Sequence, residues 1–158
     1  MLTYLSLYNV IPRGYMPKSE TGAFQLIPHH CGISVPDLEA SIAWYRDMLG
    51  FSVEKRLTLD VVPARIAFLK HGDFFIELFQ IEDAAPLPEE RRQPDRDICT
   101  HGTKHIAFAV DDVHKFINAL KKRGVDMAMD VNIMENKAMA FIRDNAGNLI
   151  EIVEAGSP

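Results

Sequence analysis

The chain has 158 residues, of which 47% are hydrophobic and 25% charged, a composition typical of one globular domain or two very small ones. The formal charge of −5, with no basic stripe, disfavours nucleic acid as a partner, because nucleic acid binding needs clustered lysine and arginine. No apolar run approaches the roughly 20 residues of a membrane span, so we expect a cytoplasmic protein without a membrane partner.

The first half of the chain begins, after an N-terminal stretch without a counterpart, with a predicted strand from Cys31 to Val35. Asp37 is the predicted N-cap of the following helix, because its carboxylate can accept from the free N–H groups of the first turn. Gly50 ends that helix, where glycine adopts a left-handed conformation easily. The helix presents an apolar stripe made of Leu38, Ile42, Tyr45 and Leu49. Three extended segments follow, the last from Phe74 to Gln80.

The second half repeats this order after a connection that is rich in proline and charge and has no periodicity. Its strand runs from Ile106 to Val110, and its helix is capped by Asp112 and stopped by Gly124. The apolar stripe of this helix consists of Val113, Phe116, Ile117 and Leu120. Three extended segments again follow, the last from Asn148 to Val153.

The two halves align at an offset of 75 residues before the helix and 74 after it, so His30 meets His105 and Glu77 meets Glu151. The matched order of elements predicts an α+β fold of two tandem βαβββ modules that form a cup-shaped mixed β-sheet with helices outside. The predicted boundaries are an N-terminal arm at 1–25, a first module at 26–82, a linker at 83–100 and a second module at 101–155.

Alternation along the strands places the four matched polar residues on one face of this sheet. In the first strand of each half the aliphatic residues face one way, and His30 or His105 faces the other. In the last strands Glu77 and Glu151 lie opposite their apolar neighbours. The residues beside each histidine are small and leave room for a cavity: Gly32, Ser34, Ala107 and Ala109.

A single histidine on a strand is more often exposed or hydrogen-bonded than a metal ligand, and a glutamate between aliphatic residues usually faces solvent. The recurrence of both at matched positions favours a metal site with His30, Glu77, His105 and Glu151 as ligands. This donor set suits one divalent ion of Ni, Co, Zn, Mn or Fe, whereas structural zinc prefers closed sites of cysteine and histidine.

Other polar residues give weaker signals. Arg65, Arg143 and the turn at Glu135–Lys137 are candidates for contact with an anionic substrate, and a plain surface role is an equal alternative for each. His29 is predicted to alternate to the side opposite His30.

On these residues the chain resembles the vicinal oxygen chelate superfamily, which has the glyoxalase and bleomycin-resistance fold. The resemblance runs from roughly Ile27 to Glu154. The matching segments are His30–Val35, Trp44–Tyr45, Leu49–Phe51, Ile76–Leu78, His105–Asp112 and Arg143–Glu151. The resemblance implies paired modules around a metal ion, the same four ligands, a small-molecule substrate and a homodimer, with the site formed within one chain or across two.

The set of two histidines and two glutamates is similar to that of bacterial-type glyoxalase I. The resemblance therefore implies a metal-dependent lyase or isomerase that transfers a proton next to a metal-bound carbonyl via an enediolate, with Glu151 or Glu77 as catalytic base. A first alternative is an acyl-CoA epimerase similar to methylmalonyl-CoA epimerase, which the segment Ile66–Leu78 resembles. A second is a non-enzymatic protein that binds an antibiotic or other small molecule, since Phe75 and Phe79 flank Glu77.

Overall fold

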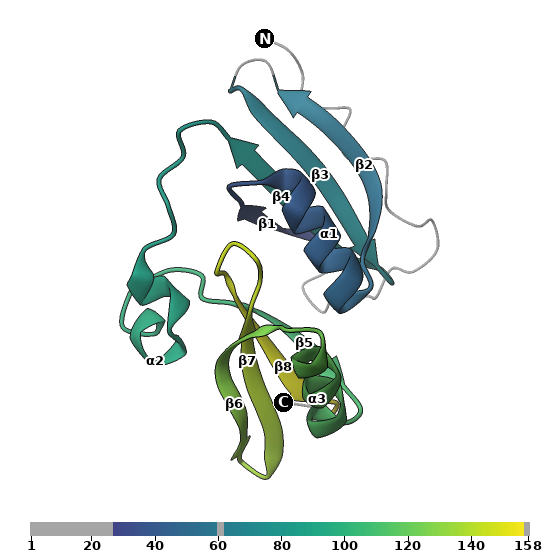
Figure 1. Cartoon of the computed structure of the whole chain (residues 1–158), viewed down its shortest axis with the longest axis vertical. Coiled ribbons are helices and arrows are strands. Elements are labelled where there is room, and N and C mark those ends of the chain that lie inside the picture. Colours follow the sequence, from purple (N-terminus) through teal and green to yellow (C-terminus); the bar gives the residue numbers. More distant parts are fainter. Residues whose placement is uncertain (1–26, 60–61, 157–158) are drawn as a thin grey trace, which may run out of the picture.

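The structure, a computed structural model, describes residues 27–59 and 62–156 and follows two successive βαβββ units (Figure 1). The first unit contains β1 (His30–Ser34), α1 (Leu38–Leu49), β2 (Ser52–Leu59), β3 (Ala64–His71) and β4 (Phe74–Ile81). The second contains β5 (Ile106–Val110), α3 (Val113–Lys122), β6 (Asp126–Met134), β7 (Lys137–Arg143) and β8 (Leu149–Glu154). The predicted α+β fold of two tandem modules is confirmed. The predicted arm at 1–25 lies outside the described residues.

Each module forms its own four-stranded mixed sheet, in the order β1-β4-β3-β2 in the first and β5-β8-β7-β6 in the second. The first strand runs parallel to the last, and the remaining pairs are antiparallel. The repeat extends to the register, because Gly32 pairs with Glu77 and Ala107 pairs with Glu151. Among the described strands, β1 and β5 therefore lie at sheet edges, each with one side unpaired.

The predicted helix ends are confirmed in both modules. The carboxylate of Asp37 accepts from the backbone N–H of Ala40 at 3.0 Å, and that of Asp112 accepts from Lys115 at 2.8 Å. Gly50 adopts a φ of 75° and Gly124 a φ of 78°, which glycine reaches without the clash that a Cβ would cause. These caps fix where each helix leaves its first strand and turns toward the next.

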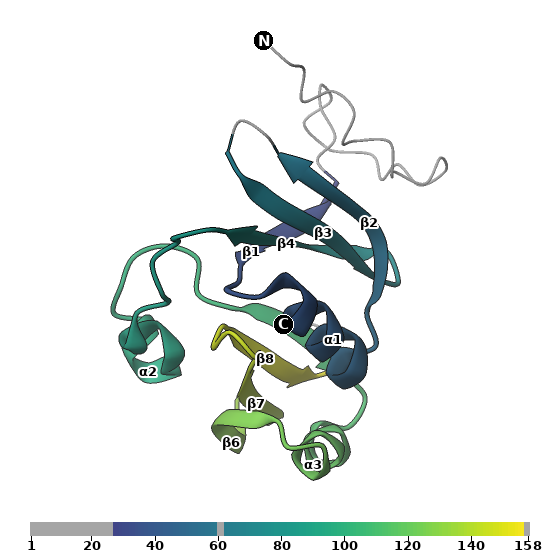
Figure 2. The ribbon, with the colours of Figure 1, turned by 45° about the horizontal axis from the view of Figure 1, so that its top comes forward.

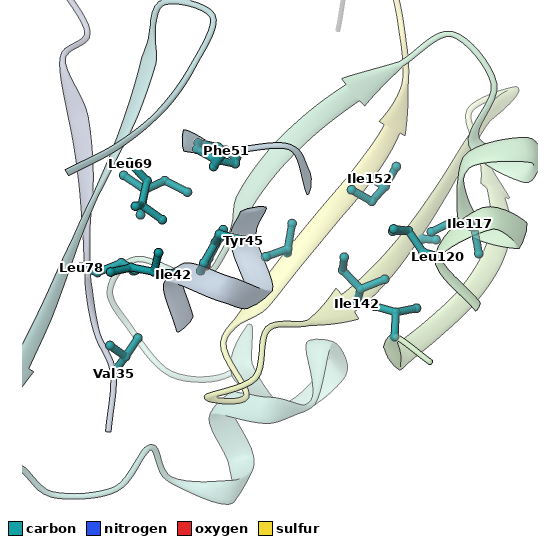
Figure 3. Packing of buried hydrophobic residues seen from close by; sticks show 14 of the residues in the cluster. Val35, Ile42, Tyr45, Phe51, Leu69, Leu78, Ile117, Leu120, Ile142 and Ile152 are labelled. Atoms are coloured by element: carbon teal, nitrogen blue, oxygen red, sulfur yellow. The ribbon is translucent and has the colours of Figure 1, made fainter. Parts of the chain in front are cut away.

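A continuous apolar core joins the two modules, because α1 lies between the first sheet and β8 (Figures 2 and 3). Tyr45 on α1 is fully buried, and its hydroxyl donates to Asp144 of the second module at 3.0 Å. Phe51 after α1 also contacts Phe108 on β5, with ring centroids 5.9 Å apart. α3, by contrast, packs on the sheet of its own module. The packing of α1 thus sets how the modules sit against each other.

The connection contains two short helical segments, η2 (Glu89–Arg92) and α2 (Pro94–Asp97), which its lack of periodicity did not predict. Arg143 on β7 links this connection to the second module. Its guanidinium donates to the carbonyl of Arg92 in the connection at 2.7 Å and to the carboxylate of Asp126 on β6 at 2.9 Å. Arg143 is itself buried, so its role is structural rather than contact with a substrate. Within the described residues, no helix combines the length and apolar character needed to cross a membrane.

Candidate metal centre

The first histidine and glutamate of the predicted site meet on the first sheet. His30 is the first residue of β1, and Glu77 lies on the neighbouring parallel strand β4. The Nε2 atom of His30 is 3.1 Å from Oε2 of Glu77. The imidazole is 27% exposed and the carboxylate 11%, so the pair is partly withdrawn from water but still reachable from one side.

The second module repeats this pair. His105 immediately precedes β5, and Glu151 lies on the parallel strand β8. Nε2 of His105 is 3.0 Å from Oε2 of Glu151, and the two side chains are 29% and 17% exposed. In each module, a histidine at the first strand and a glutamate on the last strand thus form the same pair, as the matched positions predict.

The predicted alternation of faces is also present. Ile76 and Leu78, on either side of Glu77, are fully buried in the core, and so are the two neighbours of Glu151, Ile150 and Ile152. The small residues beside the histidines, which were expected to leave space, are exposed: Gly32, Ser34, Ala107 and Ala109. The face of each sheet that carries the predicted ligands, called the ligand face below, is therefore the one turned away from the main core.

One of these small residues has a specific packing role. A Cβ on Gly32 would lie 3.0 Å from Cε2 of Phe79, so the phenyl ring occupies the space that a side chain there would need. In the second module Ala107 takes the place of Gly32, and the smaller Val153 takes the place of Phe79. The ligand faces of the two modules therefore share their polar residues but differ in their apolar surroundings.

Two phenylalanines belong to the site and were missed when only polar residues were considered. Phe68 on β3 lies directly across from Glu77, and its ring is 5.5 Å from that of His30 at an interplanar angle of 81°. Phe141 on β7 lies across from Glu151 and contacts His105 at 5.0 Å and 86°. The signal in the sequence was a phenylalanine nine residues before one glutamate and ten before the other.

Burial and a neighbouring imidazole both act on the Glu77 carboxyl group. Burial raises the pKa of Glu77 above its ordinary value, and the adjacent His30 imidazole counteracts part of that rise. Nδ1 of His30 also lies 2.6 Å from Nδ1 of His29, and the His29 ring stacks on Phe75 at 5.8 Å. The predicted alternation of His29 away from His30 therefore does not separate the two rings.

The two His–Glu pairs do not meet within one chain. Across residues 27–59 and 62–156, no three side chains of histidine, cysteine, aspartate or glutamate gather closely enough to share a metal ion. An open groove of about 1490 Å³ runs instead along β1 and the connection to the start of β5, and His105 lies on its wall. This arrangement leaves each pair as half of the predicted donor set.

The remaining candidates lie elsewhere. Arg65 donates to Glu39 at 2.9 Å in an exposed ion cluster that also includes Arg56. Glu135 and Asn136 form the exposed tip between β6 and β7, with φ values of 50° and 66°. In the described structure the geometry does not bring any of these residues into a His–Glu pair.

Among curated proteins, the chain is 31% identical over 129 residues to the uncharacterized protein YaeR of Escherichia coli, covering 80% of this chain and 94% of YaeR. It is 27% identical over 135 residues to human mitochondrial methylmalonyl-CoA epimerase, with coverages of 80% and 73%. It is 29% identical over 129 residues to the lactoylglutathione lyase of Haemophilus influenzae, with coverages of 79% and 90%.

Among solved structures, a glyoxalase family protein from Enterococcus faecalis superposes with a TM-score of 0.68 at 24% identity, covering 80% of this chain and 95% of that one. This likeness supports the fold. The family model for the Glyoxalase/Bleomycin resistance protein/Dioxygenase superfamily matches residues 27–152, which include both modules and all four predicted ligands. The chain belongs to that superfamily.

Proposed function

We propose that the chain is a metal-dependent lyase or isomerase of the glyoxalase I type, which moves a proton at a carbon next to a carbonyl group. The observation that carries this proposal is the His–Glu pair, which recurs at the same register in both modules and on the same sheet face. The similarity to a lactoylglutathione lyase agrees with this reaction class.

The donor set fits a divalent ion of the first transition row. Each pair supplies one imidazole nitrogen and one carboxylate oxygen within about 3 Å of each other, and two pairs supply four such donors. When bound, the cation would polarise a carbonyl oxygen of the substrate. The proposed ligands are His30, Glu77, His105 and Glu151.

Because one chain keeps its two pairs apart, we place the complete site between two copies of the chain. Among the described strands, β1 and β5 each have an unpaired edge, and the two histidines lie at or just before the first residue of these strands. A second copy can approach both half-sites along these edges. The first module of one copy then faces the second module of the other, and a symmetric homodimer contains two sites.

The glutamates are the groups that move the proton. The Glu77 side chain is 11% exposed, so its carboxylate would meet a substrate carbon in surroundings that hold little water. Glu151 is more exposed and occupies the equivalent place in the other half-site. One of the two accepts the proton from the substrate carbon and returns it to the neighbouring carbon.

Complementation tests the metal site and its composition. One variant carries His30→Ala and Glu77→Gln, and the other carries His105→Ala and Glu151→Gln. Each alone should bind no Co²⁺ or Ni²⁺ and should not convert the hemithioacetal of methylglyoxal and glutathione. Co-expressed, they should recover about a quarter of the wild-type sites per chain, since half of the dimers are mixed and each mixed dimer has one intact site. No recovery would exclude a site shared between copies.

A second candidate reaction is the epimerisation of an acyl-CoA, favoured by the similarity to methylmalonyl-CoA epimerase. Both reactions remove a proton next to a carbonyl, so the same glutamates serve either one. Exchange of the substrate's α-deuterium with water, without thioester formation from the hemithioacetal, would select epimerisation. The opposite pair of results would select the glyoxalase reaction.

A further inference from the structure

We infer that Phe68 and Phe141 are positioning residues, each of which holds the ligand histidine of its module in one ring orientation. The inference rests on the proposed metal site and adds to it the side chains that prepare its two imidazoles. Neither phenylalanine provides a metal ligand, so each would act through its histidine.

The contact occurs twice with nearly the same geometry. Phe68 meets His30 at 5.5 Å and 81°, and Phe141 meets His105 at 5.0 Å and 86°. Each phenylalanine also pairs across the sheet with the glutamate of the same half-site. Histidine, glutamate and phenylalanine thus form a compact group of three side chains in each module, with the histidine at the start of the first strand (His30) or just before it (His105).

The phenylalanine recurs in both modules at this cross-strand position, but the positions two residues before and after the glutamate hold different residues in the two modules. Two residues before each glutamate stand Phe75 and Leu149, and two residues after it stand Phe79 and Val153. The modules therefore differ at both same-strand neighbours of the glutamate. They agree at the cross-strand position, which is the one in contact with the histidine ring.

The physical role follows from what the glutamate leaves undetermined. The contact between Nε2 and a carboxylate oxygen fixes one point of each imidazole but not the plane of the ring. At His30 the His29 ring adds a contact at Nδ1, 2.6 Å away. A perpendicular phenyl ring limits rotation of the imidazole plane, and the electrostatics of aromatic rings favour the edge-to-face arrangement. Phe68 and Phe141 are 7% and 6% exposed, so neighbouring side chains restrict both rings. Phe68 packs with Ala64 and Ile66 in a second apolar cluster outside the main core. An imidazole already in its ligand orientation loses less freedom when it binds a metal.

Metal binding by the full-length protein provides the first test. We expect Phe68→Leu and Phe141→Leu each to weaken Co²⁺ binding about 10-fold in calorimetry, within the range seen when outer-shell partners of metal ligands are removed. Phe74→Leu is the matched control, because Phe74 lies on β4 but contacts Phe108 in the main core. It should bind Co²⁺ like the wild type. Wild-type affinity in both test variants would overturn the inference.

A double-mutant cycle separates positioning from a general loss of structure. Once His30→Ala has removed the imidazole, Phe68→Leu should weaken Co²⁺ binding no further. An equal additional loss in that background would show that Phe68 acts on the fold rather than through His30. Phe68→Met provides a second variant of similar volume if the leucine variant does not fold.

A metal-free measurement keeps this inference separate from the proposed function. Side-chain couplings in NMR spectra should show one χ1 rotamer for His30 in the wild type and rotamer averaging in Phe68→Leu. The Phe74→Leu control should keep the single rotamer. A wild-type protein that binds no Co²⁺ would remove the metal site, while the rotamers would still decide whether Phe68 orients His30. An unchanged His30 rotamer in Phe68→Leu would overturn the positioning role.

Discussion

The hydroxyl of Tyr45 is the polar link between the two modules that offers the clearest stability test. Tyr45→Phe removes one oxygen from a fully buried side chain and leaves the ring in place. The lost contact is a 3.0 Å hydrogen bond to Oδ2 of Asp144, a carboxylate that is itself only 3% exposed. The substitution therefore tests a single interaction across the junction of the modules.

The remaining partners of Asp144 set the magnitude. Its Oδ1 atom accepts from the backbone N–H groups of Ala146 at 2.9 Å and Asn148 at 2.8 Å, and Oδ2 keeps the Asn148 amide at 2.9 Å. The carboxylate thus stays bonded, so the cost falls toward the lower end of the range for hydrogen bonds to charged groups. We expect a loss of about 2 kcal/mol in the free energy of unfolding.

Urea denaturation measures this loss directly. The midpoint should fall by roughly 1 M with an unchanged slope, and the melting temperature should fall by roughly 4–8 °C. In an Asp144→Asn background, Tyr45→Phe should cost less, because the charged acceptor is already absent. A Tyr45→Phe protein within about 0.5 kcal/mol of the wild type would refute the reasoning.

Burial, together with the Asp144 charge, raises the pKa of Tyr45 well above its ordinary value, so the folded hydroxyl stays protonated where the unfolded one ionises. The free energy of unfolding should therefore fall above about pH 10, by up to ~1.4 kcal/mol per pH unit. Urea titrations in this pH range should show that the difference in free energy of unfolding between the wild type and Tyr45→Phe becomes smaller. Gly32→Ala should cost about 1 kcal/mol because its methyl group meets the Phe79 ring, and a Phe79→Val background should remove that cost; equal costs in both backgrounds would contradict the contact. Asp37→Ala and Asp112→Ala should each lower the free energy of unfolding by about 1 kcal/mol in urea denaturation. An unchanged free energy would mean that water takes over the hydrogen bond of the capping carboxylate.

The sequence was most informative where one local rule was sufficient. The period of two along β4 predicted that Glu77 lies on the face opposite Ile76 and Leu78. The full burial of the Ile76 and Leu78 side chains confirms this. The caps at Asp37 and Asp112 follow from the hydrogen-bonding needs of a first helical turn. Such features depend on residues within a few positions of each other.

Features that depend on packing between elements were not accessible in this way. Nothing in the local pattern around Arg143 shows that its guanidinium is buried against the carbonyl of Arg92, about 50 residues earlier in the chain. The contact of Phe68 with His30 similarly needs the order β1-β4-β3, which places a third strand beside the ligand pair. A search limited to polar residues passes over such a partner.

Whether the two half-sites meet in one chain is decided by α1. This helix buries Ile42 and Tyr45 between the first sheet and the second module, so the modules join through their core sides. The faces that carry the four predicted ligands are turned away from the main core, and the contacts of α1 therefore leave the His30–Glu77 and His105–Glu151 pairs apart in one chain. If a metal joins the half-sites of two copies, it adds to the stability of the dimer without altering the junction at Tyr45. Metal loading should then raise the melting temperature of wild-type and Tyr45→Phe proteins by similar amounts, since the two interactions share no residue.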